Sequence, residues 1–316
     1  MEKILKSISF YFAPFCVLKA AMDAGITDFL LDSFIPFDEL SLRAKLDAEG
    51  VKRVLEVLYQ MGLLDRKENS FKLKEELKKF FEVQSPFYIG HYLEHLKNLN
   101  NRWENLAKAL KGKREPLKKT KDMALLAKAL FPINWGSALE LENKLNFRVK
   151  RALDVGCGSC VWSIPFALKG ARVFALDLPE VIENAAFPIV KSFALSGNYS
   201  FIKGDLFQVE WGKGYELIIW GNICHIFPAE KIELMMQKAF KALNSKGKLV
   251  IVDFVKDSKA LFPYLFDINM YLATRKGKTY SPAEIQHLAK KAGLEFRNAI
   301  PLDEERNHSA LVLEKP

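Results

Sequence analysis

The sequence has few cysteines and no apolar run long enough to cross a membrane. Its four cysteines do not have the spacing of a secreted disulfide framework, and no secretory signal is recognisable. They are Cys16, Cys157, Cys160 and Cys224. The apolar stretch from Ile8 to Met22 contains Pro14 and Lys19 and falls short of the roughly 20 residues that a membrane span needs. We therefore expect a cytoplasmic protein with reduced thiols.

Internal repeats and low-complexity segments are also absent, and about half of the residues are apolar. A chain of 316 residues with this composition can bury a large core and is long enough for two domains. The net charge of +9 is uneven, with a basic cluster in one short segment. Its members are Lys108, Lys111, Lys113, Arg114, Lys118, Lys119 and Lys121. Because no aromatic residues are interleaved, we expect a solvated surface rather than a nucleic-acid site, with contact to anionic lipid headgroups as the alternative.

The run from Arg151 to Cys160, RALDVGCGSC, joins an apolar strand pattern to two closely spaced glycines. A second apolar run ends at Asp177, about twenty residues further along. Gly156 and Gly158 permit a sharp turn and close approach of the backbone, and an acid at the second strand tip can accept both ribose hydroxyls. The pattern predicts a β-α-β nucleotide cradle for an adenosine derivative.

Three further strand patterns, at residues 199–203, 217–220 and 248–253, continue the α/β alternation. Polar or acidic groups follow these strands, at the sheet edge where an open α/β sheet binds its ligand. The dinucleotide fingerprint G-x-G-x-x-G is not met, and the third position of its G-x-G-x-G variant holds Cys160. A zinc site built from Cys157, Cys160, Cys224 and His225 is conceivable, but the first pair lies in the loop that a cofactor must occupy. We therefore expect no metal and small buried residues beside a ligand.

Residues 1–83 contain short helical patterns followed by a hairpin pattern, the order of a winged-helix domain. The third helix is expected at residues 47–60, and the hairpin turn at residues 65–69. Acidic residues offset the basic ones on that helix, which argues against DNA binding. The apolar residues at the N-terminus of this domain cover more surface than a small domain can bury, which predicts a homodimer. These are Phe10, Tyr11, Phe12, Phe15 and Leu18.

Residues 84–150 add a helical linker and lid region before a sheet domain at residues 151–316. Two segments of the first part, VLKAAMDAGITDFL and RVLEVLYQMGLL, and the later motifs DVGCGS, DLPEVI, GDLF, NICHIFP and ALNSKGKLVIVDF occur in a characteristic order. In this order the whole chain resembles the small-molecule O-methyltransferases, a family that includes plant phenolic, hydroxyindole and bacterial antibiotic and pigment enzymes. The resemblance implies a Rossmann-like class I methyltransferase sheet with helices on both faces, preceded by a mainly α winged-helix dimerisation domain.

The resemblance also implies S-adenosylmethionine as the methyl donor. Asp177 would accept hydrogen bonds from the ribose hydroxyls, and Gly156 and Gly158 would pass under the methionine part. Asp205 and Leu206 would bracket the adenine. For Asp177 and Asp205 the alternative is that each carboxylate caps the following helix. Further donor-site residues are Asp154, Leu178 and Asn222. Expected pocket residues for a small-molecule acceptor are Trp135, Phe266, Met270 and Thr274.

His225 matches the family's catalytic base, and Asp253 matches the carboxylate that holds it. Imidazole, with an ordinary pKa near 6.5, is suited to take a hydroxyl proton at neutral pH. Neighbouring strands lie about 4.8 Å apart, so the two strand ends can meet, and the carboxylate would fix the tautomer. The expected reaction is methyl transfer to a hydroxyl of an aromatic or lipophilic small molecule, of phenol, quinone or pigment type.

Four positions depart from the family pattern. Ile226 and Phe227 follow the histidine where Asp-Trp is frequent, Gly221 replaces a lysine of plant members, and Thr279 replaces a second glutamate. Transfer to carbon, nitrogen or sulfur, or another reaction with the same cofactor, therefore stays open. An RNA methyltransferase or winged-helix nucleic-acid-binding protein is the alternative from another class, although residues 221–224 lack the Pro-Pro-aromatic motif of base methylation.

Overall fold

Residues 1–96 form one unit of the chain and residues 97–316 form a second, with the boundary inside helix α6 (Gly90–Trp103). The computed structural model describes residues 11–114, 123–257 and 260–316. The division at residues 83/84 and 150/151 expected from the sequence stays a prediction.

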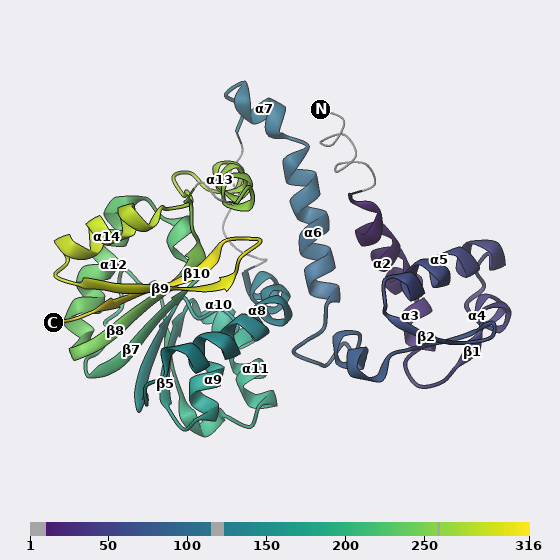
Figure 1. Ribbon diagram of the computed structural model, residues 1–316, viewed down its shortest axis with the longest axis horizontal. Coiled ribbons are helices and arrows are strands. Elements are labelled where there is room, and N and C mark those ends of the chain that lie inside the picture. The colour runs from purple at the N-terminus through teal and green to yellow at the C-terminus, as the bar shows by residue number, and fades with distance from the viewer. Residues whose placement is uncertain (1–10, 115–122, 258–259) are drawn as a thin grey trace. The chain divides into compact units, whose positions relative to one another are not determined.

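The first unit is a set of short helices with a small antiparallel sheet of order β1-β3-β2 (Figure 1). Its elements are α2 (Ala13–Asp23), α3 (Ile26–Phe29), β1 (Ile35–Pro36), α4 (Phe37–Ala44), α5 (Ala48–Gln60), β2 (Leu64–Lys67), β3 (Ser70–Leu73) and the 3₁₀ helix η1 (Glu75–Phe80). Asp47 caps α5 by accepting a hydrogen bond from the Gly50 amide at 2.6 Å. The expected third helix and hairpin are therefore confirmed.

The hairpin turn is shorter than expected. Strand β2 continues through Lys67, which pairs with Ser70, so that only Glu68 and Asn69 connect the strands. Glu68 has a φ of 54°, as a two-residue hairpin turn requires. The polar residues at 65–67 look like turn residues in sequence but lie on an exposed strand.

The second unit contains a seven-stranded sheet of order β6-β5-β4-β7-β8-β10-β9. Its strands are β4 (Arg151–Val155), β5 (Arg172–Asp177), β6 (Tyr199–Lys203), β7 (Tyr215–Gly221), β8 (Leu243–Phe254), β9 (Glu295–Asp303) and β10 (His308–Glu314). The first five in the spatial order are parallel, and β10 is antiparallel to β8 and to β9. The chain order reverses between β4 and β7, which creates a crevice at their carboxyl ends.

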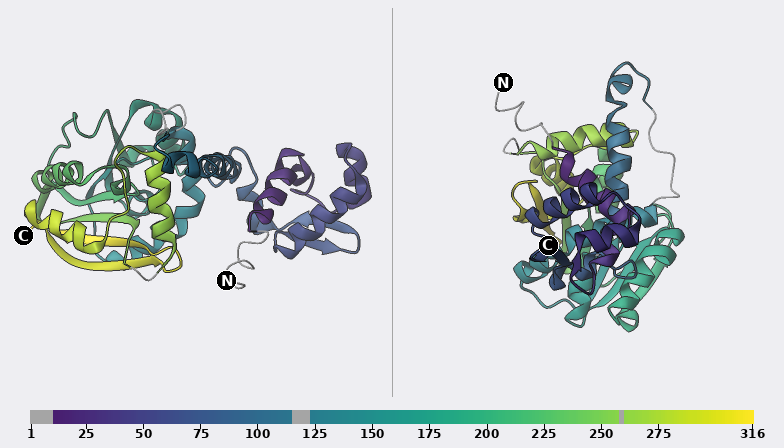
Figure 2. Two further views of the ribbon diagram at one scale, coloured as in Figure 1. Left: turned by 90° about the horizontal axis from the view of Figure 1, so that it is seen from above. Right: turned by 90° about the vertical axis from the view of Figure 1, so that its right-hand side faces the viewer.

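Helices cover both faces of this sheet (Figures 1 and 2). The helices and turns of the second unit are α7 (Leu106–Leu110), α8 (Met123–Leu145), α9 (Ile164–Leu168), α10 (Pro179–Val181), the π turn η2 (Ile182–Ala186), α11 (Phe187–Ser192), η3 (Ser196–Asn198), η4 (Cys224–Ile226), α12 (Ala229–Ala242), α13 (Phe262–Ala273) and α14 (Pro282–Lys291). Helices α8 to α11 gather on one face, and α12 and α14 pack together on the other. The expected Rossmann-like α/β fold is confirmed.

The basic segment contributes to packing through Arg114. Its guanidinium donates hydrogen bonds to the carbonyl oxygens of Tyr271 and Arg275 and lies 4.7 Å from the centre of the Tyr271 ring. Lys118, Lys119 and Lys121 lie outside the described residues. Among the helices that are described, none combines the length and apolar character needed to cross a membrane.

Candidate active site

The glycine loop after β4 is built for close backbone contact. Gly156 and Gly158 have φ values of 66° and 54°. A Cβ on Gly156 would lie 2.1 Å from Cδ1 of Ile223, and the positive φ disfavours any residue other than glycine there. Cys160 also has a positive φ, of 60°, and Cys157 and Cys160 are both buried. A series of turns follows before α9 begins at Ile164.

Two carboxylates support this loop. The Oδ2 atom of Asp177 accepts a hydrogen bond from the Gly158 amide at 2.8 Å, and Oδ1 accepts one from the Leu178 amide at 2.7 Å. Asp154 is buried, and its Oδ2 atom accepts a hydrogen bond from the Ser163 hydroxyl at 2.6 Å. Burial raises the pKa of Asp154 to about 7 and also raises the pKa of Asp177. The loop therefore holds carboxyl groups in a poorly solvated place.

The loop after β6 lies beside the end of β5. The Gly204 amide donates a hydrogen bond to the Asp177 carbonyl at 2.9 Å. Asp205 turns its Oδ1 atom toward the Phe207 amide at 2.8 Å, and the Leu206 carbonyl accepts hydrogen bonds from Trp211 and Lys238. Asp205 thus stabilises a local turn at residues 206–208 and does not cap a helix, while no partner is found for its Oδ2 atom among the described residues. Asp177 does not cap α10, whose N-cap residue is Leu178.

His225 and Asp253 meet at the carboxyl ends of β7 and β8. The Nδ1 atom of His225 lies 2.7 Å from Oδ1 of Asp253, and the His225 amide donates a hydrogen bond to Oδ2 at 3.2 Å. A carboxylate at Nδ1 favours the tautomer with the proton on Nδ1, which leaves a lone pair on Nε2. His225 is only 8% exposed. The pair is therefore held rigidly and oriented for accepting a proton at Nε2.

Aromatic rings surround this histidine. The Phe266 ring packs edge-on against His225, with centroids 4.8 Å apart, and the Phe254 ring lies 4.6 Å from Phe266. Phe262 lies 4.9 Å from Phe254. Among the other expected pocket residues, Met270 is buried on α13, the same helix as Phe266. The wall beside His225 is therefore largely aromatic.

The remaining two expected pocket residues have other neighbours in the structure. Thr274 ends α13, where its hydroxyl donates a hydrogen bond to the Met270 carbonyl at 2.8 Å. Trp135 stacks on Phe131 at 5.5 Å and lies 5.1 Å from Phe193. Their place in an acceptor pocket stays a prediction.

The four departures from the family pattern have distinct surroundings. Gly221 is needed because the Trp162 ring lies where its Cβ would be, at 2.0 Å. Ile226 is 40% exposed, and Phe227 packs edge-on against Phe207. Thr279 is buried, and among the described residues its hydroxyl has no hydrogen-bond partner.

One residue near this site was missed from the sequence. His308, the first residue of β10, places Nε2 2.8 Å from Oδ1 of Asn222. Strand β10 pairs with β8, so that Ser309 faces Asp253 across the sheet. A lone histidine at the start of a late strand carries no spacing signal, and only strand pairing brings it to the site.

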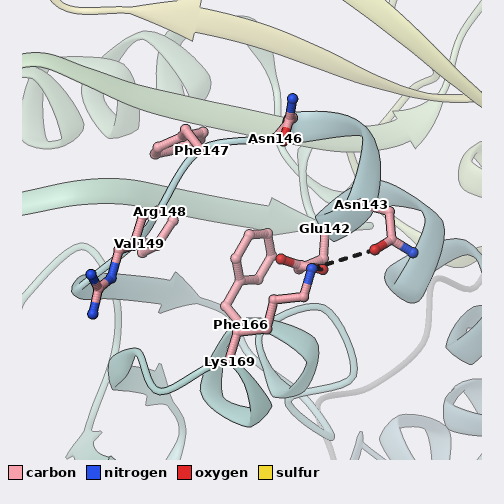
Figure 3. Close-up of a pocket in the computed structure, with 8 residues that line it drawn as sticks. All are labelled: Glu142, Asn143, Asn146, Phe147, Arg148, Val149, Phe166 and Lys169. Carbon is pink, nitrogen blue, oxygen red and sulfur yellow. Dashed lines mark hydrogen bonds and ion pairs between the residues drawn. The ribbon is translucent and has the colours of Figure 1, made fainter.

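One cavity among the described residues lies elsewhere. It has a volume of about 310 Å³ and is lined by the end of α8, residues 146–149 and α9 (Figure 3). Glu142 forms an ion pair with Lys169 across it. Residues 146–149 precede β4, so this cavity belongs to the amino ends of the strands. Within the described ranges, no group of three or more His, Cys, Asp or Glu residues could hold a metal ion.

Comparisons with known proteins agree with this arrangement. A family model for the O-methyltransferase domain matches residues 113–295, more than half of the chain. TcmO, the tetracenomycin polyketide 8-O-methyltransferase of Streptomyces glaucescens, is 24% identical over 294 residues, 87% of this chain and 86% of TcmO. Human N-acetylserotonin methyltransferase, solved with SAM, has a TM-score of 0.78 at 18% identity, covering 99% of this chain and 97% of that one. CalO1, a methyltransferase of calicheamicin biosynthesis solved with SAH, has a TM-score of 0.76 at 19% identity, covering 100% and 98%.

Proposed function

Because the chain belongs to the O-methyltransferase family, we propose that it uses S-adenosylmethionine to methylate a hydroxyl of an aromatic or lipophilic small molecule. The observation that carries this proposal is the His225–Asp253 pair, with its 2.7 Å contact, beside the glycine loop. Ile223, two residues before His225, packs directly against Gly156 of that loop. The base and the donor loop therefore lie at one edge of the sheet.

The residues around the glycine loop fit the donor. Gly156 and Gly158 turn the backbone at positive φ values, and Asp177 can accept hydrogen bonds from ribose hydroxyls. The free Oδ2 atom of Asp205 suits an adenine amino group, and Leu206 suits the ring face. Asp154 supports the loop through Ser163, and Leu178 follows the acid. Asn222, which the sequence comparison with the family placed at the donor site, follows β7 at the same edge of the sheet.

When bound, S-adenosylmethionine supplies an electrophilic methyl group. His225 accepts the acceptor's hydroxyl proton at Nε2, which makes the oxygen nucleophilic as the new bond forms. Asp253 keeps the ring oriented and stabilises the imidazolium that results. Phe254, Phe262 and Phe266 form an apolar wall that suits a flat aromatic acceptor and excludes water from the proton transfer.

A labelling experiment tests the reaction. The protein is incubated with methyl-labelled S-adenosylmethionine and small-molecule extracts, and products that gain label are identified by mass spectrometry and NMR. We expect the label on an oxygen of an aromatic compound. Label on carbon, nitrogen or sulfur would replace the acceptor assignment but keep the cofactor, whereas label in RNA would favour the nucleic-acid alternative.

The DNA-binding alternative receives no support from α5. Its Glu49 pairs with Arg53 at 2.8 Å, and Glu56 pairs with Arg66 at 2.9 Å. These arginines are therefore partly neutralised by neighbouring acids. Phosphate contacts need unpaired basic side chains on the presented face.

We also propose a homodimer through the N-terminal unit. Tyr11 is 84% exposed, Phe12 62% and Leu42 79%, which is unusual for large apolar side chains. Phe15 and Leu18 are half-buried, and Phe10 lies outside the described residues. Light scattering at micromolar concentration is expected to give the mass of a dimer, and Tyr11→Lys with Phe12→Lys is expected to shift it toward the monomer. A monomeric mass for the unaltered protein would contradict the proposal.

A further inference from the structure

His308 is buried in an aromatic setting beside the candidate base. It is 1% exposed, and its ring lies 4.6 Å from the Phe254 ring and 5.6 Å from the Trp162 ring. Its Nε2 atom contacts Oδ1 of Asn222 at 2.8 Å, and its Nδ1 atom has no partner among the described residues. Burying a histidine that makes only one polar contact costs free energy of folding. The contact with Asn222 is therefore worth explaining by a role in the site.

The surroundings determine which atom of the pair donates. Burial lowers the pKa of His308 to about 4, so the ring is neutral at pH 7. With the proton on Nε2, His308 donates to Oδ1 of Asn222 and leaves only a lone pair without a partner on Nδ1. The other tautomer would leave a buried N–H without an acceptor, which costs more. The Asn222 amide is therefore held with its oxygen toward His308 and its nitrogen, Nδ2, directed away.

Asn222 is the first residue after the carboxyl end of β7. Its backbone has a φ of 55°, and its backbone N–H donates a hydrogen bond to the Val252 carbonyl at 2.8 Å. The next residue, Ile223, packs against Gly156, and His225 follows two residues later. Asn222 thus shares a short loop with the proposed base. The residues proposed to hold the donor's ribose and adenine follow β5 and β6, on the other side of β4.

We propose that His308 is a positioning residue that presents Asn222 Nδ2 as a hydrogen-bond donor to the acceptor molecule. This inference rests on the proposed function. A side-chain N–H donor here suits an acceptor molecule whose methylated hydroxyl has a carbonyl or ether oxygen next to it, because such an oxygen only accepts hydrogen bonds. Without His308, the Asn222 amide can rotate and offer its oxygen instead, which would repel that second oxygen.

Two substitutions of similar polarity test the geometry of the pair. In His308→Gln the side-chain amide nitrogen reproduces the position of Nε2, whereas in His308→Asn it reproduces that of Nδ1. We expect His308→Gln to keep kcat/KM for the labelled acceptor within about 3-fold, and His308→Asn and Asn222→Ala to lose about 10- to 100-fold. The double variant His308→Asn with Asn222→Ala is expected to lose no more than Asn222→Ala, because both act through one amide.

The affinity for S-adenosylhomocysteine, measured by calorimetry, separates an acceptor role from a donor role. We expect it to stay within about 2-fold in each variant, since the acceptor alone is affected. A fall in this affinity would return Asn222 to the donor site and overturn the inference. Equal losses in His308→Gln and His308→Asn, or no loss in either, would overturn it as well. If the unaltered protein labels no hydroxylated aromatic, the proposed function fails instead.

A substrate pair checks the chemical class. 3-Methoxy-2-naphthol has, beside the hydroxyl to be methylated, an ether oxygen that can only accept a hydrogen bond, and 2-naphthol lacks one. We expect the unaltered protein to prefer the former by about 10-fold in kcat/KM, and His308→Asn to remove this preference. An equal preference in both proteins would contradict the assignment of Asn222 to the second oxygen.

Discussion

The two units of this chain bury different kinds of side chain. In residues 11–96 the core is apolar, with Leu30, Leu40 and Leu55 fully buried, and the buried polar residues described there are Thr27 and Ser41. Besides buried cysteines and tyrosines, the described part of residues 97–316 buries four acidic or histidine side chains. They are Glu142, Asp154, His225 and His308. The first unit is held by packing, whereas the second also keeps groups that can change charge.

Burying an ionisable group costs free energy of folding unless a partner offsets it, so a buried group without a charged partner suggests a functional role. Glu142 has Lys169, and His225 has Asp253. Asp154 and His308 instead have neutral partners, Ser163 and Asn222, and their pKa values move toward the neutral form. Three of the four lie at the carboxyl edge of the sheet. This contrast identifies the second unit as the site of the chemistry, and variants in each unit can test it.

The largest effect is expected at His225. His225→Ala should lower kcat by about 10²- to 10⁴-fold, the usual contribution of general-base catalysis, because it removes the proposed proton acceptor. Donor affinity, measured by calorimetry, should stay nearly unchanged. Asp253→Asn should cost somewhat less, since the imidazole remains but loses its fixed tautomer and counter-charge.

The exposed His287 on α14 provides the control, and His287→Ala should leave kcat unchanged. Full turnover by His225→Ala on the true acceptor would show that no base is needed. Methyl transfer would then depend on positioning or on an acceptor that is already ionised.

A core substitution in the first unit should separate the two units by stability. Leu55→Ala removes a fully buried side chain from α5 and should lower the free energy of unfolding of this unit by about 2 to 5 kcal/mol. Trp103, the first of the five tryptophans, lies beyond residue 96, so tryptophan fluorescence reports on the second unit alone. Hydrogen exchange in residues 48–60 should therefore speed up while the fluorescence transition stays in place. The matched variant Leu153→Ala in β4 should shift the fluorescence transition and leave hydrogen exchange in residues 48–60 unchanged. If either variant changed both readouts, the two cores would not be independent.

Much of the second unit could be predicted from local patterns. The strand at residues 199–203 has the bounds expected, and the strands ending at Asp177 and beyond Asp253 place their acids as expected, because carboxyl ends of parallel strands share one edge. The His225–Asp253 contact was expected from the resemblance and agrees with the measured 2.7 Å. These features depend on short stretches of sequence and one rule of topology.

Other features depend on contacts between distant segments and could not be predicted. Strands β9 and β10 were not expected, because antiparallel pairing at the sheet edge has no local signal. His308 reaches Asn222 only through that pairing. The need for glycine at position 221 follows from the Trp162 ring, which comes from the loop after β4.

The second unit should lose stability at acid pH because His308 is buried in its neutral form. Its pKa is lowered from 6.5 to about 4 by burial, so the folded state resists protonation that the unfolded chain accepts. The free energy of unfolding is therefore unaffected by this histidine above pH 6.5. It falls as the pH is lowered from 6.5 to 4, by roughly 3 kcal/mol in total. Urea unfolding followed by tryptophan fluorescence at pH 7 and pH 4.5 measures this loss. His308→Gln lacks the titrating group, so its loss over the same range should be smaller, and an equal loss would argue against a neutral buried imidazole.

The smallest of these effects is expected at Asp177, where the second unit meets the donor. Asp177→Ala removes a carboxylate that can bind ribose hydroxyls and that already accepts hydrogen bonds from Gly158 and Leu178. Binding of S-adenosylhomocysteine should weaken by about 1.5 to 3 kcal/mol, the scale of a hydrogen bond to a charged group. Calorimetry measures this, with Glu180→Ala on the exposed surface of α10 as the control. Asp177→Asn keeps one acceptor oxygen and the side-chain shape, so it should lose less. If the unaltered protein binds a nicotinamide dinucleotide more tightly than S-adenosylhomocysteine, the loop after β4 serves a different cofactor, and the buried carboxyl groups around it need another explanation.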